Sequence, residues 1–292
     1  MKHNANGFKG ALSSLPEAEQ QLLLSQLCSE DFSGQLSGFS TPAINLASAL
    51  LPLAATFSVA PISGFHVGAV AVGTSGALYL GANLEFANAP LSATLHAEQS
   101  AVLNAWIHGE TSLQALAISE APCGFCRQFL WELPEAATLP IIVGDTHTNL
   151  AQLLPMPFGE LRKRGHGLLD SPPAPLQSTT AITSDHAQQA VEAAQHSYTP
   201  YTHTPEGFAI KCADGKHFVG RAAESIAFNP SIPAVLCALN QRNLSSSHNE
   251  SIERATQAMP ATSQHSSSDL AATILSGISN VTIQTVQLNP EK

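Results

Sequence analysis

Charged side chains are scarce in this 292-residue sequence, at 12% of the residues, and the basic ones are the scarcer kind. Lys and Arg number 12 against 22 Asp and Glu, so the formal net charge is −10. The densest basic stretch is the short run 162–164. Because proteins hold nucleic-acid backbones mostly through clustered Lys and Arg, the composition argues against a nucleic-acid partner. A small uncharged substrate fits this composition better.

Long hydrophobic runs are also missing. The longest apolar stretch, residues 47–55, is much shorter than the roughly 18 residues of a membrane span. The first residues, Met1–Asn4, lead into polar sequence and not into an apolar signal core. We therefore expect no membrane partner and a cytoplasmic location.

Cysteines are few, and they do not form the pattern of a disulfide framework. There are five, an odd number, unevenly spread along the chain, at Cys28, Cys123, Cys126, Cys212 and Cys237. Reduced thiols fit a chain in a reducing compartment, where closely spaced cysteines more often bind metal.

The residues that are present are those of a globular protein. Hydrophobic residues make up 44%, and the length suffices for one large domain or two ordinary ones. Residues 1–55 have helical patterns. The elements expected after them are a hairpin of strands 65–72 and 77–80, a buried helix 92–107, a strand 113–119, a helix 123–133 and a strand 139–143. This order predicts an α/β fold, a mixed sheet covered by helices.

The second half of the chain repeats the first. Residues 200–210 echo residues 61–67, and residues 213–220 echo the hairpin around 73–81. Self-similarity of this kind indicates two copies of one structural unit. Further pairs in this comparison are Glu224 with Glu85, Asn229 with Asn88, and helix 232–239 with 91–98. The chain is Ser-rich after about 245, with a helix expected near 270–275 and a strand near 281–286.

Two short motifs carry the chemistry. His96 and Glu98 fall at the start of the first buried helix, and Cys123 and Cys126 open the next one. Two cysteines three positions apart on a helical first turn can face one centre, and a histidine from a second helix start can complete three sides of a tetrahedron. Three protein ligands leave a fourth position for water, as in a catalytic zinc site. Zinc lowers the pKa of such a water toward neutrality.

Two neighbouring residues can assist this centre. Glu98 need not bind metal and can take a proton from the water and hand it to a substrate. Arg127 follows the second cysteine and can offset thiolate charge from outside the ligand set. A lone C-x-x-C is more often a structural zinc knuckle or a redox pair. A structural site would require a fourth Cys or His, and none lies close in sequence.

The pattern H-x-E followed by P-C-x-x-C is the signature of zinc nucleobase deaminases. Together with the segments Phe65–Ala69 and Gly81–Phe86, it makes the chain resemble the cytidine deaminases of the larger, two-copy, homodimeric bacterial type. The resemblance implies a three-layer α-β-α fold in two tandem copies and one Zn²⁺ per chain. It also implies hydrolysis of cytidine and 2′-deoxycytidine to uridine and 2′-deoxyuridine with release of ammonia, a step of pyrimidine salvage.

The same resemblance implies roles for individual residues. Asn83 and Glu85 would bind the ribose 3′ hydroxyl, and Phe65 would line the base pocket. Glu98 would contact the base at its ring nitrogen N3 and at the leaving amine. The backbone N–H of Ala97 and the carbonyl of Ala121 would read the edge of the base.

The second copy departs from the motif. Cys237 is expected opposite His96 and Leu239 opposite Glu98, and no P-C-x-x-C follows residue 212. This copy should therefore be catalytically silent. By resemblance the chain forms a homodimer, and Phe158 and Phe228 would form part of the partner subunit's active-site wall. The expected division is a helical segment 1–55, a catalytic deaminase domain 56–165, a Gly/Pro/Ser-rich linker 166–182 and a degenerate deaminase-like domain 183–292.

Two other functions stay open at this point. One is deamination of tRNA, single-stranded nucleic acid or a nucleotide, which requires basic channels or phosphate-binding residues. The other is a non-catalytic zinc protein or nucleoside-binding module. The acidic balance opposes the first function, and the presence of Glu98 opposes the second.

Overall fold

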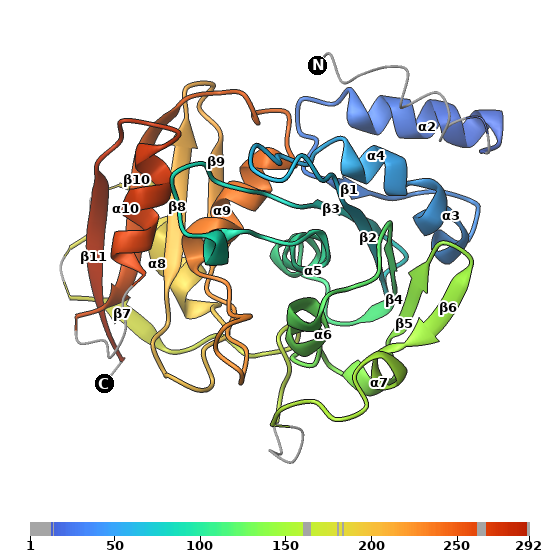
Figure 1. Ribbon diagram of the computed structural model, residues 1–292. Helices are drawn as coiled ribbons and strands as arrows, with labels where there is room; N and C mark the ends of the chain where they lie inside the picture. The colour runs from blue at the N-terminus through green and yellow to red at the C-terminus, as the bar shows by residue number, and fades with distance from the viewer. Residues whose placement is uncertain are drawn as a thin grey trace. The chain divides into compact units, whose positions relative to one another are not determined.

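The computed structural model describes residues 13, 15–159, 165–179, 181–182, 184–261 and 267–290, so the basic run 162–164 lies outside the described residues. The chain divides into two compact units, each built around its own sheet (Figure 1). Unit 1 comprises Met1–Glu85, Thr94–Asp170 and Leu244–Ser246. Unit 2 comprises Phe86–Ala93, Ser171–Asn243 and Ser247–Lys292.

The sheet of unit 1 has six strands in the order β1-β3-β2-β4-β5-β6. Only β4 and β5 are parallel neighbours, and helix α6 lies between them in the sequence, as a parallel crossover requires. The strand bounds are Gln35–Leu36 (β1), Gly68–Gly73 (β2), Leu78–Ala82 (β3), Leu113–Ile118 (β4), Pro140–Val143 (β5) and Thr146–Asn149 (β6).

Helices cover both faces of this sheet (Figure 1). A Cβ on Gly68 would lie 2.5 Å from the Leu51 carbonyl oxygen of α4, and one on Gly81 would lie 2.3 Å from the Ala101 nitrogen of α5. The two glycines point to opposite faces and let a helix backbone approach each one closely. The helix bounds are Glu17–Leu27 (α2), Ala43–Ala49 (α3), Leu51–Ala55 (α4), Ala97–Ile107 (α5), Gly124–Leu130 (α6) and Leu150–Leu153 (α7).

The main core of unit 1 lies between one sheet face and the N-terminal helices. On that face Val70 of β2 pairs with Leu80 of β3, and Val72 pairs with Leu78; all four are fully buried. Apolar side chains of α2, α3 and α4 cover them. The three helices described within the segment expected over 1–55 are therefore packed into this unit.

Unit 2 repeats the plan with five strands in the order β7-β11-β10-β8-β9. Helix α8 packs against β8 on the face to which Gly207 points, and α9 packs against β9 where Gly220 points. The bounds are Leu176–Ser178 (β7), Gly207–Cys212 (β8), His217–Arg221 (β9), Ile252–Pro260 (β10), Ile283–Pro290 (β11), Asp185–Gln195 (α8), Ala234–Asn243 (α9) and Ser268–Ser276 (α10). The predicted fold class, two copies of a helix-covered mixed sheet, is confirmed.

The pairing of the two copies corrects one expectation. Leu84 bridges Leu95 in unit 1, and Ala223 bridges Ile232 in unit 2. In the matching contact between strand and helix, Gly81 faces the Ala97 carbonyl in unit 1, and Gly220 faces the Ala234 carbonyl in unit 2. The connection from strand to helix is thus two residues shorter in the second copy.

That shift changes the matched residues of the helix. Pro233 stands opposite His96, and Val235 stands opposite Glu98. The expectation of Cys237 and Leu239 in these places was wrong, because it assumed a connection of the wrong length. Neither Pro nor Val can bind a metal or shuttle a proton, so the expectation of a catalytically silent second copy does not depend on that pairing and stays a prediction.

Element ends also differ from expectation. Helix α5 begins at Ala97 and not near residue 92, because Leu95 pairs with Leu84 and His96 has extended backbone angles. Strands β1, β6, β7 and β10 were not foreseen, and β7 lies inside the expected linker 166–182. The division into four segments stays a prediction. Within the described part of the chain, no helix is long and apolar enough to cross a membrane.

Candidate active site

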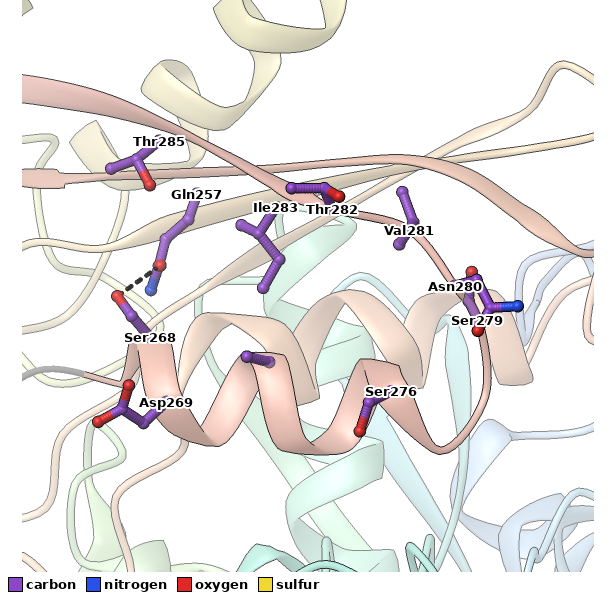
Figure 2. A pocket seen from close by; sticks show the side chains of 11 residues that line it. Gln257, Ser268, Asp269, Ser276, Ser279, Asn280, Val281, Thr282, Ile283 and Thr285 are labelled. Atoms are coloured by element: carbon purple, nitrogen blue, oxygen red, sulfur yellow. Dashed lines mark hydrogen bonds between the residues drawn. The ribbon is translucent and has the colours of Figure 1, made fainter.

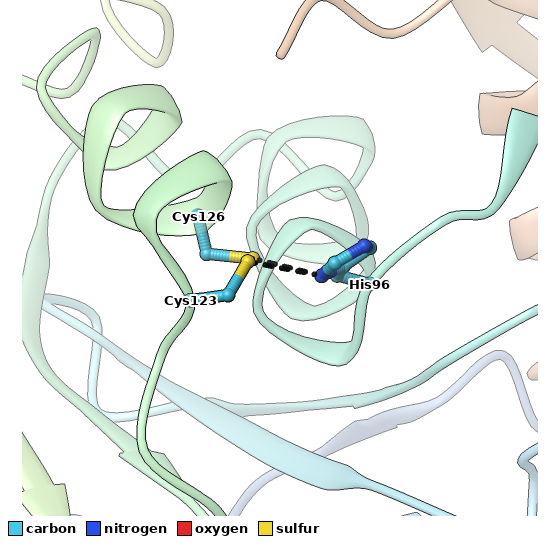
Figure 3. Close-up of side chains that lie close together, drawn as sticks. All are labelled: His96, Cys123 and Cys126. Atoms are coloured by element: carbon cyan, nitrogen blue, oxygen red, sulfur yellow. Dashed lines mark hydrogen bonds between the residues drawn. The ribbon is translucent and has the colours of Figure 1, made fainter. Parts of the chain in front are cut away.

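Three side chains from two helix starts meet at one point in unit 1 (Figure 3). The Nδ1 atom of His96 lies 3.5 Å from the Sγ of Cys123 and 3.3 Å from the Sγ of Cys126. The two sulfur atoms are 3.7 Å apart. Among the described residues this is the one group of three or more His, Cys, Asp or Glu side chains arranged to hold a metal ion.

The backbone explains why these residues converge. His96 is the N-cap of α5, and its N–H donates to the Oε1 atom of Gln99 at 3.1 Å, which fixes the start of the helix. Cys123 is the N-cap of α6, and Cys126 lies one turn along, fully buried. Cap residues leave the helix path, so their side chains turn toward the neighbouring helix start.

The separations fit a tetrahedral zinc site. Bond lengths of about 2.3 Å for zinc–sulfur and about 2.0–2.1 Å for zinc–nitrogen place tetrahedral sulfur ligands roughly 3.8 Å apart, and sulfur and nitrogen roughly 3.5 Å apart. The three separations agree with these values within about 0.2 Å. The donor set, one imidazole and two thiols, is also one that zinc prefers.

Protonation is shared unevenly within this cluster. The pKa of Cys123 is lowered to about 3, first by the hydrogen bond that it shares with Cys126 and then by His96. The pKa of Cys126 is raised, because it keeps the shared proton and is buried. The pKa of His96 is raised by its hydrogen bond with Cys123. The cluster therefore carries a ready thiolate, and a bound cation would release the remaining proton.

Glu98 lies in the first turn of α5 beside the cluster and is only 5% exposed. Burial raises the pKa of its carboxyl above the ordinary value. A carboxyl whose pKa is raised in this way holds a proton more readily than an exposed one, which suits a group that accepts and returns protons.

A cavity of about 300 Å³ opens next to these groups. Most of the residues predicted from the sequence line it, and each belongs to unit 1. The predicted residues in the lining are Phe65, Asn83, Glu85, His96, Ala97, Glu98, Ala121 and Cys123. Cys126 lies behind the lining, fully buried. The structure thus brings the ligand set, the proton carrier and the proposed substrate contacts to one cavity.

Asn83 is tied to the loop between α4 and β2. Its Oδ1 atom accepts from the Ser58 hydroxyl at 2.7 Å and from the Val67 N–H at 2.9 Å. Its Nδ2 atom donates to the Phe65 carbonyl at 2.9 Å. The amide is held in one orientation at the cavity wall.

Glu85 holds the same loop further along. Its Oε2 atom accepts from the N–H groups of Ile62 and Ser63 at 2.8 and 3.0 Å, and its Oε1 atom accepts from the Ser63 hydroxyl. Burial opposes ionisation here, but these hydrogen bonds hold the pKa of Glu85 below its ordinary value. The side chain is therefore a carboxylate in a fixed position.

The other predicted residues lie outside the cavity. Arg127 donates from Nε to the Pro122 carbonyl and from Nη1 to the Leu153 carbonyl, both at 2.8 Å, so it braces the loop that precedes Cys123. Phe158 in unit 1 and Phe228 in unit 2 are 66% and 60% exposed.

Several lining residues escaped the sequence analysis: Ser63, Val67, Thr94 and Glu120. Only their place in the fold gives them a role, since the residue types are ordinary. The sequence analysis gave no role to Phe125, which lies between the two cysteines of the motif. Its ring stacks on that of His96, with centroids 6.3 Å apart and planes 21° apart. An aromatic residue between the two cysteines was the signal for that contact.

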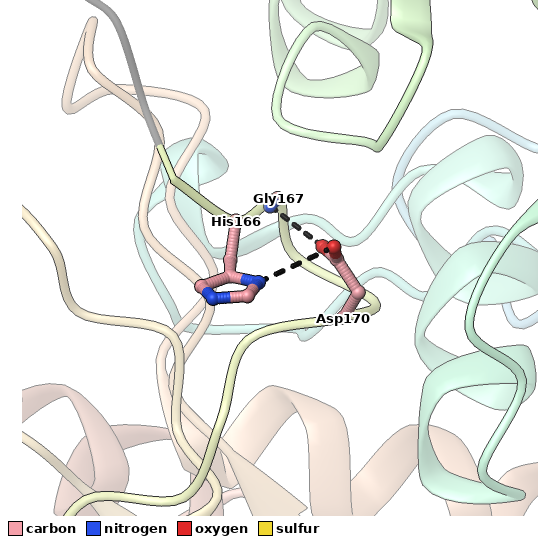
Figure 4. A network of polar contacts seen from close by, with 3 residues as sticks. All are labelled: His166, Gly167 and Asp170. Carbon is pink, nitrogen blue, oxygen red and sulfur yellow. Dashed lines mark hydrogen bonds and ion pairs between the residues drawn. The ribbon is translucent and has the colours of Figure 1, made fainter.

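Other polar features of the described chain lack this combination. An open groove between α10 and β11 of unit 2 is lined mainly by uncharged side chains, with the Ser268 hydroxyl bonded to Gln257 at 2.8 Å (Figure 2). His166 pairs with Asp170 at 3.4 Å, and the Gly167 N–H donates to the same carboxylate (Figure 4). Both charged groups of that pair are exposed, which makes it a weak surface interaction.

A helix-covered mixed sheet with a His/Cys/Cys centre and a buried glutamate is typical of the zinc-dependent deaminases that act on nucleobases. The family described as "Cytidine and deoxycytidylate deaminase zinc-binding region" matches residues 44–139 and, in a second profile, residues 150–271. The chain belongs to the cytidine deaminase family, in its two-copy form, and zinc is the metal of the site.

Two relatives that match most of the chain agree with this assignment, and one solved structure is similar to part of it. The cytidine deaminase of Serratia proteamaculans (strain 568) is 38% identical over 275 residues, which cover 87% of this chain and 89% of that protein. The cytidine deaminase of Yersinia pestis (strain Pestoides F) is 40% identical over 258 residues, 85% of this chain and 87% of that protein. The crystal structure of cytidine deaminase from Mycobacterium tuberculosis covers 40% of this chain and 97% of its own, at 33% identity and a TM-score of 0.37.

Proposed function

We propose that the chain hydrolyses cytidine and 2′-deoxycytidine to uridine and 2′-deoxyuridine with release of ammonia, a step of pyrimidine salvage. The observation that carries this proposal is the placement of Glu98 beside the cluster of His96, Cys123 and Cys126, at one wall of a nucleoside-sized cavity.

His96, Cys123 and Cys126 hold one Zn²⁺ per chain. When bound, zinc supplies Lewis acidity that makes water a nucleophile at neutral pH. Arg127 keeps the Cys123 loop in place through the Pro122 carbonyl, and it lies close enough along the helix to offset thiolate charge.

Glu98 carries the proton through the reaction. It takes a proton from the attacking water and delivers it to ring nitrogen N3 as oxygen adds to C4. It then takes the second proton of that oxygen and delivers it to the amino group as the C4–N bond breaks, so ammonia leaves and a carbonyl forms. Burial raises the pKa of this carboxyl, so it holds the transferred proton more readily than an exposed glutamate would between the two steps.

The base is held by the cavity wall. Phe65 covers one face of the ring, and the N–H of Ala97 and the carbonyl of Ala121 meet its edge. Ala97 is the first residue of α5, where the N–H has no partner within the helix, so it is available to a substrate oxygen. Asn83 and Glu85 take the ribose 3′ hydroxyl.

Charge favours a nucleoside over a nucleotide. Three carboxyl side chains line the cavity, Glu85, Glu98 and Glu120, and the lining contains no Lys or Arg. A phosphate group on the sugar would meet repulsion there without a compensating cation. The acidic balance of the whole chain opposes a polymer in the same way.

Unit 2 has a structural role, and the active enzyme is a homodimer. Proline and valine stand where the first copy has its histidine ligand and its proton carrier. Phe158 and Phe228 are large apolar side chains and more than half exposed, so both are available to a partner surface. They are suited to close the partner subunit's cavity.

All five cysteines are free, which fits the cytoplasm.

A panel of substrates tests this function. Cytidine, CMP and a cytosine-containing oligonucleotide are offered at equal concentration, and ammonia release is measured for each. We expect turnover of cytidine, at least about 100-fold weaker turnover of CMP, and none of the oligonucleotide. Turnover of the oligonucleotide alone would overturn the proposal. Light scattering on the active enzyme tests the dimer, and an active monomer would contradict a shared cavity wall.

A further inference from the structure

Hydrogen-bond capacity limits how Asn83 can meet a ligand. An amide side chain has two acceptor lone pairs and two N–H donors. Both lone pairs of Oδ1 are taken, by the Ser58 hydroxyl and the Val67 N–H, and one N–H is taken by the Phe65 carbonyl. One N–H remains. Asn83 can therefore only donate to a ligand, and it can donate once.

Glu85 is limited in the opposite sense. A carboxylate has about four acceptor sites and no donor. Its Oε2 atom accepts from the N–H groups of Ile62 and Ser63, and its Oε1 atom accepts from the Ser63 hydroxyl. One acceptor site remains, on Oε1. Glu85 can therefore only accept from a ligand, and it can accept once.

From these contacts we infer that Ser63 is a positioning residue of the enzyme: its hydroxyl holds Oε1 of Glu85 so that the last open acceptor of the carboxylate serves the sugar hydroxyl that also accepts from the last open donor of Asn83. A hydroxyl can donate and accept, whereas an ether oxygen or a hydrogen atom cannot do both. The inference rests on the proposed function and adds the residue that positions the sugar contact.

Ser63 makes two contacts of different kinds. Its hydroxyl donates to Glu85 and accepts from the Phe65 N–H at 3.0 Å. The second contact is to the backbone of the loop, whereas the first is to the carboxylate that takes the sugar, so loss of the hydroxyl acts mainly on the sugar contact. Ser63 itself lines the cavity, which places these contacts at the substrate and not behind it.

Unit 2 contains the same group of hydrogen bonds, and there they have only a structural role. Glu224 accepts from the N–H groups of Tyr201 and Thr202 and from the Thr202 hydroxyl, and that hydroxyl accepts from the Thr204 N–H at 3.2 Å. The same clamp is present where no chemistry occurs, so it also serves to fasten a loop. A purely structural clamp in unit 1 would have the same effect on every substrate.

The test compares Ser63→Ala with the unchanged enzyme on two substrates, cytidine and 3′-deoxycytidine. Loss of one hydrogen bond to a charged group at a binding site costs on the order of tenfold or more in kcat/KM. We expect kcat/KM for cytidine to fall about 10- to 50-fold, mostly through KM. We expect it to change less than about threefold for 3′-deoxycytidine, which lacks the selected hydroxyl. Equal losses on both substrates would overturn the inference.

Thr202→Val is the matched control, because it removes the same hydroxyl from the clamp of unit 2. We expect it to lower the melting temperature by an amount similar to that of Ser63→Ala while kcat/KM stays within about twofold of the unchanged enzyme. A loss in kcat/KM equal to that of Ser63→Ala would also overturn the inference. Turnover of cytidine by the unchanged enzyme is measured separately, so failure of the proposed function would be seen as such.

Discussion

The carboxylates of Glu85 and Glu224 hold the same place in the two units, each accepting hydrogen bonds from two successive backbone N–H groups and one hydroxyl. Glu85 lies in the unit that holds the His/Cys/Cys cluster. Glu224 lies in the unit where proline and valine stand in the places of His96 and Glu98. The duplicated chain therefore separates what the fold requires from what the chemistry requires. It also supplies a matched control for most substitutions in the catalytic unit.

Replacing the proton carrier should stop catalysis without removing the metal. Glu98→Gln keeps the size and burial of the side chain but cannot shuttle a proton. We expect kcat to fall by at least about 10²- to 10⁴-fold, while zinc content by atomic absorption stays at one ion per chain. Near-full activity of this variant would contradict the role of Glu98.

Removing a ligand should have the opposite signature. Cys123→Ser takes away the thiolate ligand of lowest pKa. We expect zinc affinity to fall by more than the roughly 10- to 100-fold effect of losing an outer-shell partner, with activity lost in proportion. Cys237→Ser, at a buried cysteine in unit 2, is the control and should leave zinc content unchanged. Equal zinc loss in both variants would point to general unfolding.

Adding a methyl group at the close contact between strand and helix, in one unit at a time, separates an effect on stability from an effect on activity. A Cβ at Gly81 would meet the Ala97 carbonyl oxygen at 2.5 Å, and one at Gly220 would meet the Ala234 carbonyl oxygen at 2.0 Å. Overpacking of this kind costs about 1–3 kcal/mol. We expect Gly81→Ala and Gly220→Ala to lower the melting temperature alike. Only Gly81→Ala, which shifts the helix that carries His96, should also weaken zinc binding, as measured by equilibrium dialysis.

Acid should weaken unit 2 through a buried histidine. The pKa of His186 is lowered from 6.5 to about 4, first by burial and then by the positive charges of His217, Arg254 and Lys211. Neither ring nitrogen of His186 has a hydrogen-bond partner, and its ring meets His217 edge-on at 5.6 Å. The unfolded chain binds a proton as the pH falls through 6.5, and the folded chain does not until about 4. Stability is therefore present above 6.5 and is lost between 6.5 and 4.

The corresponding experiment is urea unfolding at pH 7 and pH 4.5 with His186→Leu alongside. We expect the unchanged protein to lose at most about 3 kcal/mol more than the variant across this interval. Parallel losses in the two proteins would show that other groups dominate the acid response.

The zinc cluster could be predicted from sequence because its residues fall in two short motifs. Cys123 and Cys126 lie one helical turn apart, so helix geometry brings their sulfur atoms together. His96 joins them from the start of another helix, and the combined H-x-E and P-C-x-x-C signature pointed to it. The repeat was visible for a similar reason, since strands and turns keep their spacing between copies. These features depend on short-range geometry.

The remaining features depend on contacts distant in sequence. The register of α9 requires knowledge of a connection two residues shorter, which a weak repeat does not reveal. Strands of two to four residues, such as Gln35–Leu36, exist only because a neighbour pairs with them. Ser63 looks like any loop serine until Glu85, far away in sequence, is placed against it. Packing decides these cases, and local preference does not.

The measurement that tests the account most directly is cytidine deamination, followed by ultraviolet absorbance, on zinc-replete protein, on protein stripped with a chelator, and after zinc is added back. The account predicts that activity is present in the first, absent in the second and restored in the third, with one zinc ion per chain in the active samples. Zinc-replete protein that leaves cytidine unchanged, or stripped protein that keeps its activity, would contradict it.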